Sequence, residues 1–103
     1  MSTSNSNPLH VDFCGMSFDS PIVLLSGCVG FGEEYTRVEG FSNRDVGAVV
    51  LKGTTGEARL GNKPHRVCET PMGMINAIGL QNPGVGKVVD GILPGLDFEE
   101  TRF

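Results

Sequence analysis

The sequence lacks the features that would assign it to several large functional classes. Among 103 residues it has 8 lysines and arginines against 12 acidic residues, which gives a net charge of -4. A protein that binds nucleic acid needs a basic face for the phosphates, and here the basic residues are few and scattered. No apolar run approaches the roughly 18 residues that a membrane-spanning helix requires. We therefore expect neither nucleic acid nor a membrane as a partner.

Secretory, disulfide and metal-site features are also missing. The opening M-S-T-S-N-S-N-P has neither the charged nor the apolar region of a signal peptide, so we interpret residues 1–8 as a disordered leader of a cytoplasmic protein. Cys14, Cys28 and Cys68 are odd in number, form no C-x-x-C motif and have no histidine at ligand spacing. We expect no disulfide framework and no metal site, and we interpret the cysteines as small buried hydrophobic residues.

The sequence matches no standard motif for nucleotide binding or hydrolysis. G-C-V-G-F-G at residues 27–32 does not have the glycine pattern of the dinucleotide-binding fingerprint. G-L-Q-N-P-G-V-G-K at residues 79–87 places its lysine wrongly for a P-loop and follows it with valine. The two histidines lie in loops, so no Ser–His–Asp arrangement can be read.

Two short apolar runs indicate an α/β fold. Residues 22–25 (I-V-L-L) and 48–51 (A-V-V-L) each end abruptly in a polar, glycine-rich turn. Continuous apolar runs of this kind are typical of strands buried on both faces of a parallel sheet. Residues 33–41, which lie between the runs, have apolar side chains at near-helical spacing and acidic residues at the front, which predicts a crossover helix.

The flanking segments extend this pattern without completing a domain. Residues 9–20 predict a small hairpin that turns around Gly15, residues 66–70 an extended piece, and residues 84–96 a helix. No third strand is expected before the sequence ends in E-E-T-R-F. Two parallel strands cannot cover their own faces, so we interpret the chain as the front part of a larger α/β domain, or as one that needs partners to fold.

Residues suited to binding follow both predicted strands. Ser26 comes directly after the first apolar run, and Lys52 and Gly53 come directly after the second. Ligands of parallel α/β folds bind at this carboxyl edge of the sheet. Lys52 is placed to neutralise an anionic ligand or the charge that develops on a reduced cofactor. The alternative is that Lys52 only extends its ammonium group to solvent from a strand end.

The stretch from Met74 to Gly84, M-I-N-A-I-G-L-Q-N-P-G, is a second candidate binding segment. It places the exposed amides of Asn76, Gln81 and Asn82 among glycines, and it has neither the helical nor the strand period of a packing segment. Amide side chains and free backbone N–H groups suit a planar polar ligand. Because N-P-G is a turn signal in itself, a plain surface turn is the alternative.

Taken in order, these motifs resemble the N-terminal third of the class 1B dihydroorotate dehydrogenases. The resemblance is carried by S-G-C-V-G-F-G-E-E-Y, by V-L-K-G-T-T and by G-N-K-P-H-R-V-C-E-T-P-M-G-M-I-N-A-I-G-L-Q-N-P-G. It extends from about residue 9 to residue 96. It implies that residues 9–103 are the N-terminal portion of an FMN-binding TIM (β/α)₈ barrel, with a small N-terminal β-hairpin, and that the barrel is incomplete in this chain.

The resemblance also implies a reaction and a set of site residues. Enzymes of this family oxidise dihydroorotate to orotate in pyrimidine biosynthesis, removing a proton from C5 and passing a hydride from C6 to flavin N5. The residues implied to bind FMN are Ser26, Lys52 and Gly53, and those implied to bind dihydroorotate are Lys52, Asn76, Ala77, Ile78, Gly79 and Leu80. Asn76 would act through its side-chain amide, and Gly79 and Leu80 through backbone N–H groups.

The partners implied by the resemblance are those of the class 1B enzymes. A second subunit with FAD and an iron–sulfur cluster relays electrons to NAD, and the complete protein is a homodimer or a heterotetramer. The family's catalytic base is a cysteine beyond the equivalent of Phe103, so we assign no catalytic residue here. We expect residues 1–103 alone to be inactive and to bind FMN weakly or not at all. The alternatives are a non-catalytic truncated remnant or interaction module, and a related flavoenzyme that oxidises another dihydropyrimidine.

Overall fold

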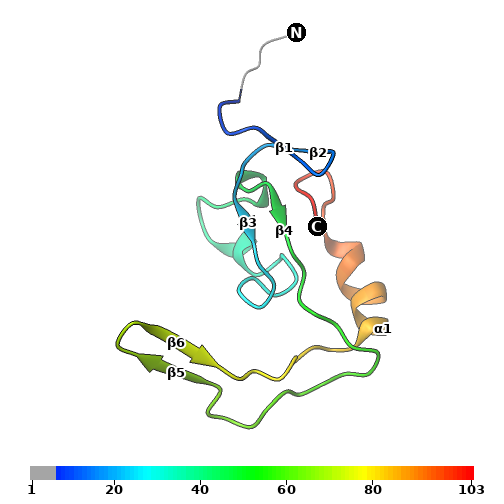
Figure 1. The fold of residues 1–103 in the computed structure, drawn as a ribbon. Helices are drawn as coiled ribbons and strands as arrows, with labels where there is room; N and C mark the ends of the chain where they lie inside the picture. The colour runs from blue at the N-terminus through cyan, green and yellow to red at the C-terminus, as the bar shows by residue number, and fades with distance from the viewer. Residues whose placement is uncertain (1–6) are drawn as a thin grey trace. The chain divides into compact units, whose positions relative to one another are not determined.

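A computed structural model describes residues 7–103, which belong to two compact units (Figure 1). The first unit comprises the residues up to Lys52 together with Leu96–Phe103, and the second comprises Gly53–Gly95. Most of the leader expected over residues 1–8 lies outside the described residues. Within the described part, the Asn7 side-chain amide donates a hydrogen bond of 2.7 Å to the Asp19 carbonyl oxygen.

The first unit begins with the expected hairpin. Strands β1 (Val11–Phe13) and β2 (Met16–Phe18) are antiparallel, with Val11 opposite Phe18. The two turn residues, Cys14 and Gly15, have φ angles of 52° and 76°. Two consecutive left-handed residues match the right-handed twist of a two-residue hairpin, so glycine suits the second position. The prediction of a hairpin turning at Gly15 is confirmed.

A parallel strand pair forms the centre of the first unit. Strands β3 (Val23–Leu24) and β4 (Ala48–Val49) pair with Val23 opposite Ala48, which confirms the predicted parallel arrangement. Among the described residues no third strand joins this pair, although Ala48 also forms an isolated parallel bridge with Arg102. The Val49 amide donates a hydrogen bond of 2.8 Å to the Arg102 carbonyl oxygen, which adds a third parallel segment beside β4.

The core of the first unit covers only one face of these strands. It consists of the buried side chains Val29, Val46 and Val49, against which Leu24, Phe41, Leu51 and Phe103 pack. The apolar side chains of Ile22, Val23, Leu25 and Val50 are exposed. The prediction that both runs are buried on both faces is therefore wrong for the described residues, because no second layer covers the other face.

The crossover helix predicted over residues 33–41 is also wrong. The connection holds two short 3₁₀ turns instead, η1 (Tyr35–Arg37) and η2 (Asn43–Asp45). The first ends where Val38 takes an extended backbone, and the left-handed Gly40, at φ 85°, prevents a helix from continuing. The second begins with a capping box, in which the Ser42 hydroxyl accepts from the Arg44 amide and the Asp45 carboxylate accepts from the Ser42 amide.

The second unit contains a hairpin and a helical stretch. Strands β5 (Val67–Thr70) and β6 (Gly73–Asn76) are antiparallel, and every residue in them is exposed. Strand β5 confirms the extended piece predicted over residues 66–70. Strand β6 overlaps the Met74–Gly84 stretch, whose sequence shows neither a helical nor a strand period. The predicted helix over residues 84–96 is confirmed as a run of three helical types: α1 (Val85–Lys87), the π-turn η3 (Val88–Ile92) and the 3₁₀ turn η4 (Leu93–Gly95).

The described residues form a small mixture of strands and helical turns. They contain no closed barrel, and the one parallel strand pair among them is β3 with β4. Within residues 7–103, no helix has both the length and the apolar character needed to cross a membrane.

Candidate functional site

The structure places Ser26 and Lys52 at the same edge of the parallel pair. Ser26 follows β3 and Lys52 follows β4, so both lie beyond the carboxyl ends of their strands. Two hydrogen bonds fix this edge. The Val50 amide donates 2.8 Å to the Leu24 carbonyl oxygen, and the Lys52 amide donates 2.9 Å to the Gly30 carbonyl oxygen. This is the edge at which parallel α/β proteins bind ligands.

A glycine-rich turn follows Ser26 and includes Gly30, whose carbonyl oxygen accepts the hydrogen bond from the Lys52 amide. Gly27, Gly30 and Gly32 have φ angles of 83°, 55° and 87°. The Glu34 carboxylate closes the turn by accepting from the Phe31 amide at 3.2 Å. A β-carbon added at Gly27 would meet no atom within 4 Å, so the backbone there is open to a flat ligand.

In the second unit, the segment that follows β6 is held by residues 59–66. The Ala77 amide donates 2.8 Å to the Arg66 carbonyl oxygen, and the Asn62 amide donates 2.8 Å to the Ile78 carbonyl oxygen. The Asn62 side-chain amide also donates 3.0 Å to the Ala77 carbonyl oxygen. The role of residues 59–66 in holding this segment was not predicted from the sequence. Their asparagine and arginine side chains were the available signal.

Gly79 and Leu80 are consecutive residues with left-handed backbones. Their φ angles are 83° and 56°, and for a leucine this conformation costs roughly 1–2 kcal/mol. A β-carbon at Gly79 would lie 2.8 Å from the Asn62 backbone nitrogen, so only glycine fits there without a shift. No hydrogen bond among residues 7–103 uses the amide nitrogen of Gly79 or Leu80. These two N–H groups are therefore available to a ligand.

Asn82 is not one of the exposed amides that the sequence predicts. It was grouped with exposed amides, but its side chain is buried, at 6% exposure. Its Nδ2 donates 2.7 Å to the Leu80 carbonyl oxygen, and its Oδ1 accepts from the Gly84 amide at 2.9 Å. Asn76 and Gln81 are exposed as expected, and Gln81 accepts 2.9 Å from Arg66.

The candidate residues divide between the two units. Ser26 and Lys52 belong to the first unit, whereas Gly53 and residues 76–80 belong to the second. Within the second unit Gly53 lies close to residues 76–80, because a β-carbon there would be 3.5 Å from Leu80 Cδ2. Each set is thus built locally, one from strand ends and the other from a paired loop.

The cysteines do not behave as predicted. Cys14, Cys28 and Cys68 are all free and exposed, so their interpretation as buried hydrophobic residues is wrong. Cys14 is in the hairpin turn and Cys68 is on the two-stranded β5–β6 hairpin, where no layer covers them. Over residues 7–103, no group of three or more histidine, cysteine or acidic side chains is arranged to hold a metal ion.

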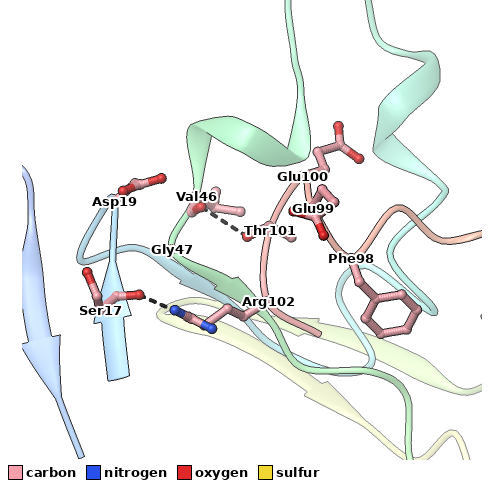
Figure 2. A pocket seen from close by; sticks show the side chains of 9 residues that line it. All are labelled: Ser17, Asp19, Val46, Gly47, Phe98, Glu99, Glu100, Thr101 and Arg102. Atoms are coloured by element: carbon pink, nitrogen blue, oxygen red, sulfur yellow. Dashed lines mark hydrogen bonds between the residues drawn. The ribbon is translucent and has the colours of Figure 1, made fainter. Parts of the chain in front are cut away.

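A pocket of about 280 Å³ lies in the first unit, away from the carboxyl edge (Figure 2). Val46 and Gly47, which directly precede β4, form one wall, and the last residues of the chain form another. Arg102 Nε donates 2.9 Å to the Ser17 carbonyl oxygen, and the Thr101 hydroxyl donates 3.2 Å to the Val46 carbonyl oxygen. Because this pocket is at the amino end of the strand, we do not assign it to the binding site.

The parallel strand pair and its polar carboxyl edge indicate an α/β protein whose candidate ligand site is at the strand ends. Comparison with known families is more specific, because the dihydroorotate dehydrogenase family matches residues 8–101. The chain belongs to the dihydroorotate dehydrogenase family. This confirms the resemblance drawn from its motifs.

Individual relatives agree with the family assignment. The catalytic subunit of dihydroorotate dehydrogenase B (NAD(+)) from Bacillus caldolyticus is 52% identical over 91 residues, which cover 88% of this chain and 28% of the relative. The subunit of the same name from Enterococcus faecalis (strain ATCC 47077 / OG1RF) is 48% identical over 91 residues, with the same coverage of each chain. This chain therefore spans little more than a quarter of the length of these relatives.

Proposed function

We propose that this chain supplies part of the FMN and substrate site of an oxidoreductase of pyrimidine biosynthesis that oxidises dihydroorotate to orotate. Family membership supports the reaction class. The observation that carries the site is the hydrogen bond from the Lys52 amide to the Gly30 carbonyl oxygen, which fixes Lys52 beside the turn that follows Ser26. Residues 1–103 alone are proposed to be inactive.

The strand-end residues fit a flat, anionic cofactor such as FMN. Ser26, Lys52 and Gly53 are the residues that would hold it, and the open backbone at Gly27 leaves room for close approach. When bound, FMN supplies a hydride acceptor at its N5 atom. The Lys52 ammonium group would stabilise negative charge that develops on bound FMN, because a fixed positive charge at a partly desolvated site favours charge that develops nearby.

The loop at residues 76–80 fits the ring and carboxylate of dihydroorotate. The Asn76 side chain offers both a donor and an acceptor, and the Gly79 and Leu80 amides offer two adjacent donors. Ala77 and Ile78 are the remaining residues of this segment that would contact the substrate. These groups would hold the substrate in one orientation.

We propose the partners from the names of the relatives. They are called catalytic subunits of an NAD(+) enzyme, which implies a separate electron-transfer subunit. That subunit carries FAD and an iron–sulfur cluster and passes electrons to NAD, and the complete enzyme is a homodimer or heterotetramer. The cytoplasmic location stays a prediction.

Purification of the full-length protein tests this proposal. The expected result is an FMN absorbance spectrum and dihydroorotate-dependent reduction of an electron acceptor, with no turnover of dihydrouracil. Turnover of dihydrouracil alone would favour a related flavoenzyme. Absence of both FMN and turnover would favour a non-catalytic remnant or interaction module.

A further inference from the structure

We propose that Asn82 is a positioning residue for the substrate loop, residues 76–80, and that it acts through Leu80 and Thr55. The inference rests on the proposed function, because it concerns how that loop is held in the conformation that binds dihydroorotate. All of the residues involved lie in the second unit.

The Asn82 side-chain amide uses its full hydrogen-bonding capacity. Its Nδ2 donates 2.7 Å to the Leu80 carbonyl oxygen and 3.0 Å to the Thr55 hydroxyl. Its Oδ1 accepts from the Gly84 amide at 2.9 Å and from the Thr55 amide at 3.2 Å. An amide has two N–H donors and one oxygen with two lone pairs, so these four bonds fix its orientation. Because the side chain is 6% exposed, water does not readily replace any of them.

The bond to Leu80 bears directly on the donors offered to substrate. Leu80 holds a left-handed backbone at φ 56°, which a non-glycine residue keeps only when its surroundings enforce it. A hydrogen bond to its carbonyl oxygen fixes the peptide plane that follows it. We infer that this bond maintains the conformation in which the Gly79 and Leu80 amides are left free for a ligand.

The bonds to Thr55 connect the loop to the proposed cofactor side. Thr55 lies two residues after Gly53, one of the residues proposed to hold FMN. One buried amide therefore links the segment that approaches the cofactor to the segment that approaches the substrate. The Thr55 hydroxyl is itself anchored, because it donates a hydrogen bond of 2.5 Å to the Glu57 carbonyl oxygen.

Three substitutions at two positions separate the parts of this network in the full-length protein. Asn82→Asp keeps the acceptors for Gly84 and Thr55 but removes the donors to Leu80 and the Thr55 hydroxyl. Thr55→Val removes the hydroxyl while keeping the side-chain shape, and Thr55→Ser restores the hydroxyl. The measurements are the orotate dissociation constant and hydrogen–deuterium exchange of the peptide covering residues 76–81.

We expect Asn82→Asp to raise the orotate dissociation constant about tenfold and to speed exchange of the loop peptide. Thr55→Val should act in the same direction with a smaller effect, and Thr55→Ser should stay within about twofold of the unaltered protein. A dissociation constant within about twofold for Asn82→Asp would overturn the positioning role. So would a loop peptide whose exchange is unchanged in both Asn82→Asp and Thr55→Val.

A matched control distinguishes positioning from general loss of stability. Asn43 is also a buried amide, at 3% exposure, and it donates 2.7 Å to the Gly32 carbonyl oxygen in the first unit. Asn43→Asp should lower thermal stability and leave exchange of residues 76–81 unchanged; faster exchange there would count against a specific role for Asn82.

Failure of the proposed function gives a different result. If the unaltered protein neither binds orotate nor oxidises dihydroorotate, the proposed function is wrong, whatever the variants show. Exchange of the loop peptide then decides the role of Asn82 by itself, since faster exchange in Asn82→Asp supports it and unchanged exchange overturns it.

Discussion

The backbone amide of Lys52 donates a hydrogen bond of 2.9 Å to the carbonyl oxygen of Gly30, which joins the end of one parallel strand to the turn after the other. Strands β3 and β4 pair over only two residues each, so this bond extends their contact beyond the regular ladder. It holds the Lys52 backbone at the carboxyl edge, where a charged side chain can contact a ligand and does not have to pack in the core.

Removal of the Lys52 charge should slow flavin reduction. In Lys52→Ala, the rate of single-turnover flavin reduction by dihydroorotate is expected to fall by about 100-fold or more, because the charge that we propose stabilises the reduced ring is lost. Stopped-flow absorbance measures this rate. Lys87→Ala is the control, since Lys87 is an exposed residue of α1 and should leave the rate unchanged. A near-normal rate in Lys52→Ala would refute this role.

A side chain at Gly79 should disrupt the substrate loop. Gly79→Ala places a β-carbon 2.8 Å from the Asn62 nitrogen in a left-handed backbone, so the loop must shift. We expect weaker orotate binding, and a free energy of unfolding lower by about 1–2 kcal/mol. Titration with orotate and denaturant unfolding measure the two effects. Gly73→Ala is the matched control, because Gly73 has no atom within 4 Å of an added β-carbon; equal effects at both glycines would contradict the account.

Adjacent valines in one run should differ in their contribution to stability. Val49 is 1% exposed and belongs to the core of the first unit, whereas Val50 is 45% exposed. Val49→Ala should lower the free energy of unfolding by about 2 kcal/mol, through lost burial and the cavity left behind. Val50→Ala should change it by less than about 0.5 kcal/mol. Chemical denaturation measures both, and a larger loss at Val50 would show that its face is covered.

The sequence predicted those parts of the fold that depend on local signals. Gly15 indicated the first hairpin, and the apolar runs indicated the parallel pairing of β3 with β4, because both signals are contained in a few residues. The crossover helix failed because near-helical spacing of apolar residues did not outweigh the left-handed Gly40 and the capping box that starts at Ser42. Burial of the runs failed because it depends on layers that the described residues do not supply.

The types of residue in the candidate site were predictable from the sequence, but the contacts that hold them in place were not. The strand-end position of Lys52 followed from its place after an apolar run. Pairing of Asn62 and Arg66 with the substrate loop was not predictable, because it joins residues 11 to 16 positions apart through irregular backbone. Asn82 was misjudged for the same reason, since burial of a turn amide depends on the segment folded against it.

The most direct test of the central claim is anaerobic mixing of the full-length, FMN-loaded protein with dihydroorotate. Flavin absorbance and orotate formation are followed together. We predict that the flavin is bleached and that one orotate forms for each flavin reduced. A flavin that stays oxidised in the presence of saturating dihydroorotate would contradict the assignment of Lys52 and residues 76–80 to a dihydroorotate site.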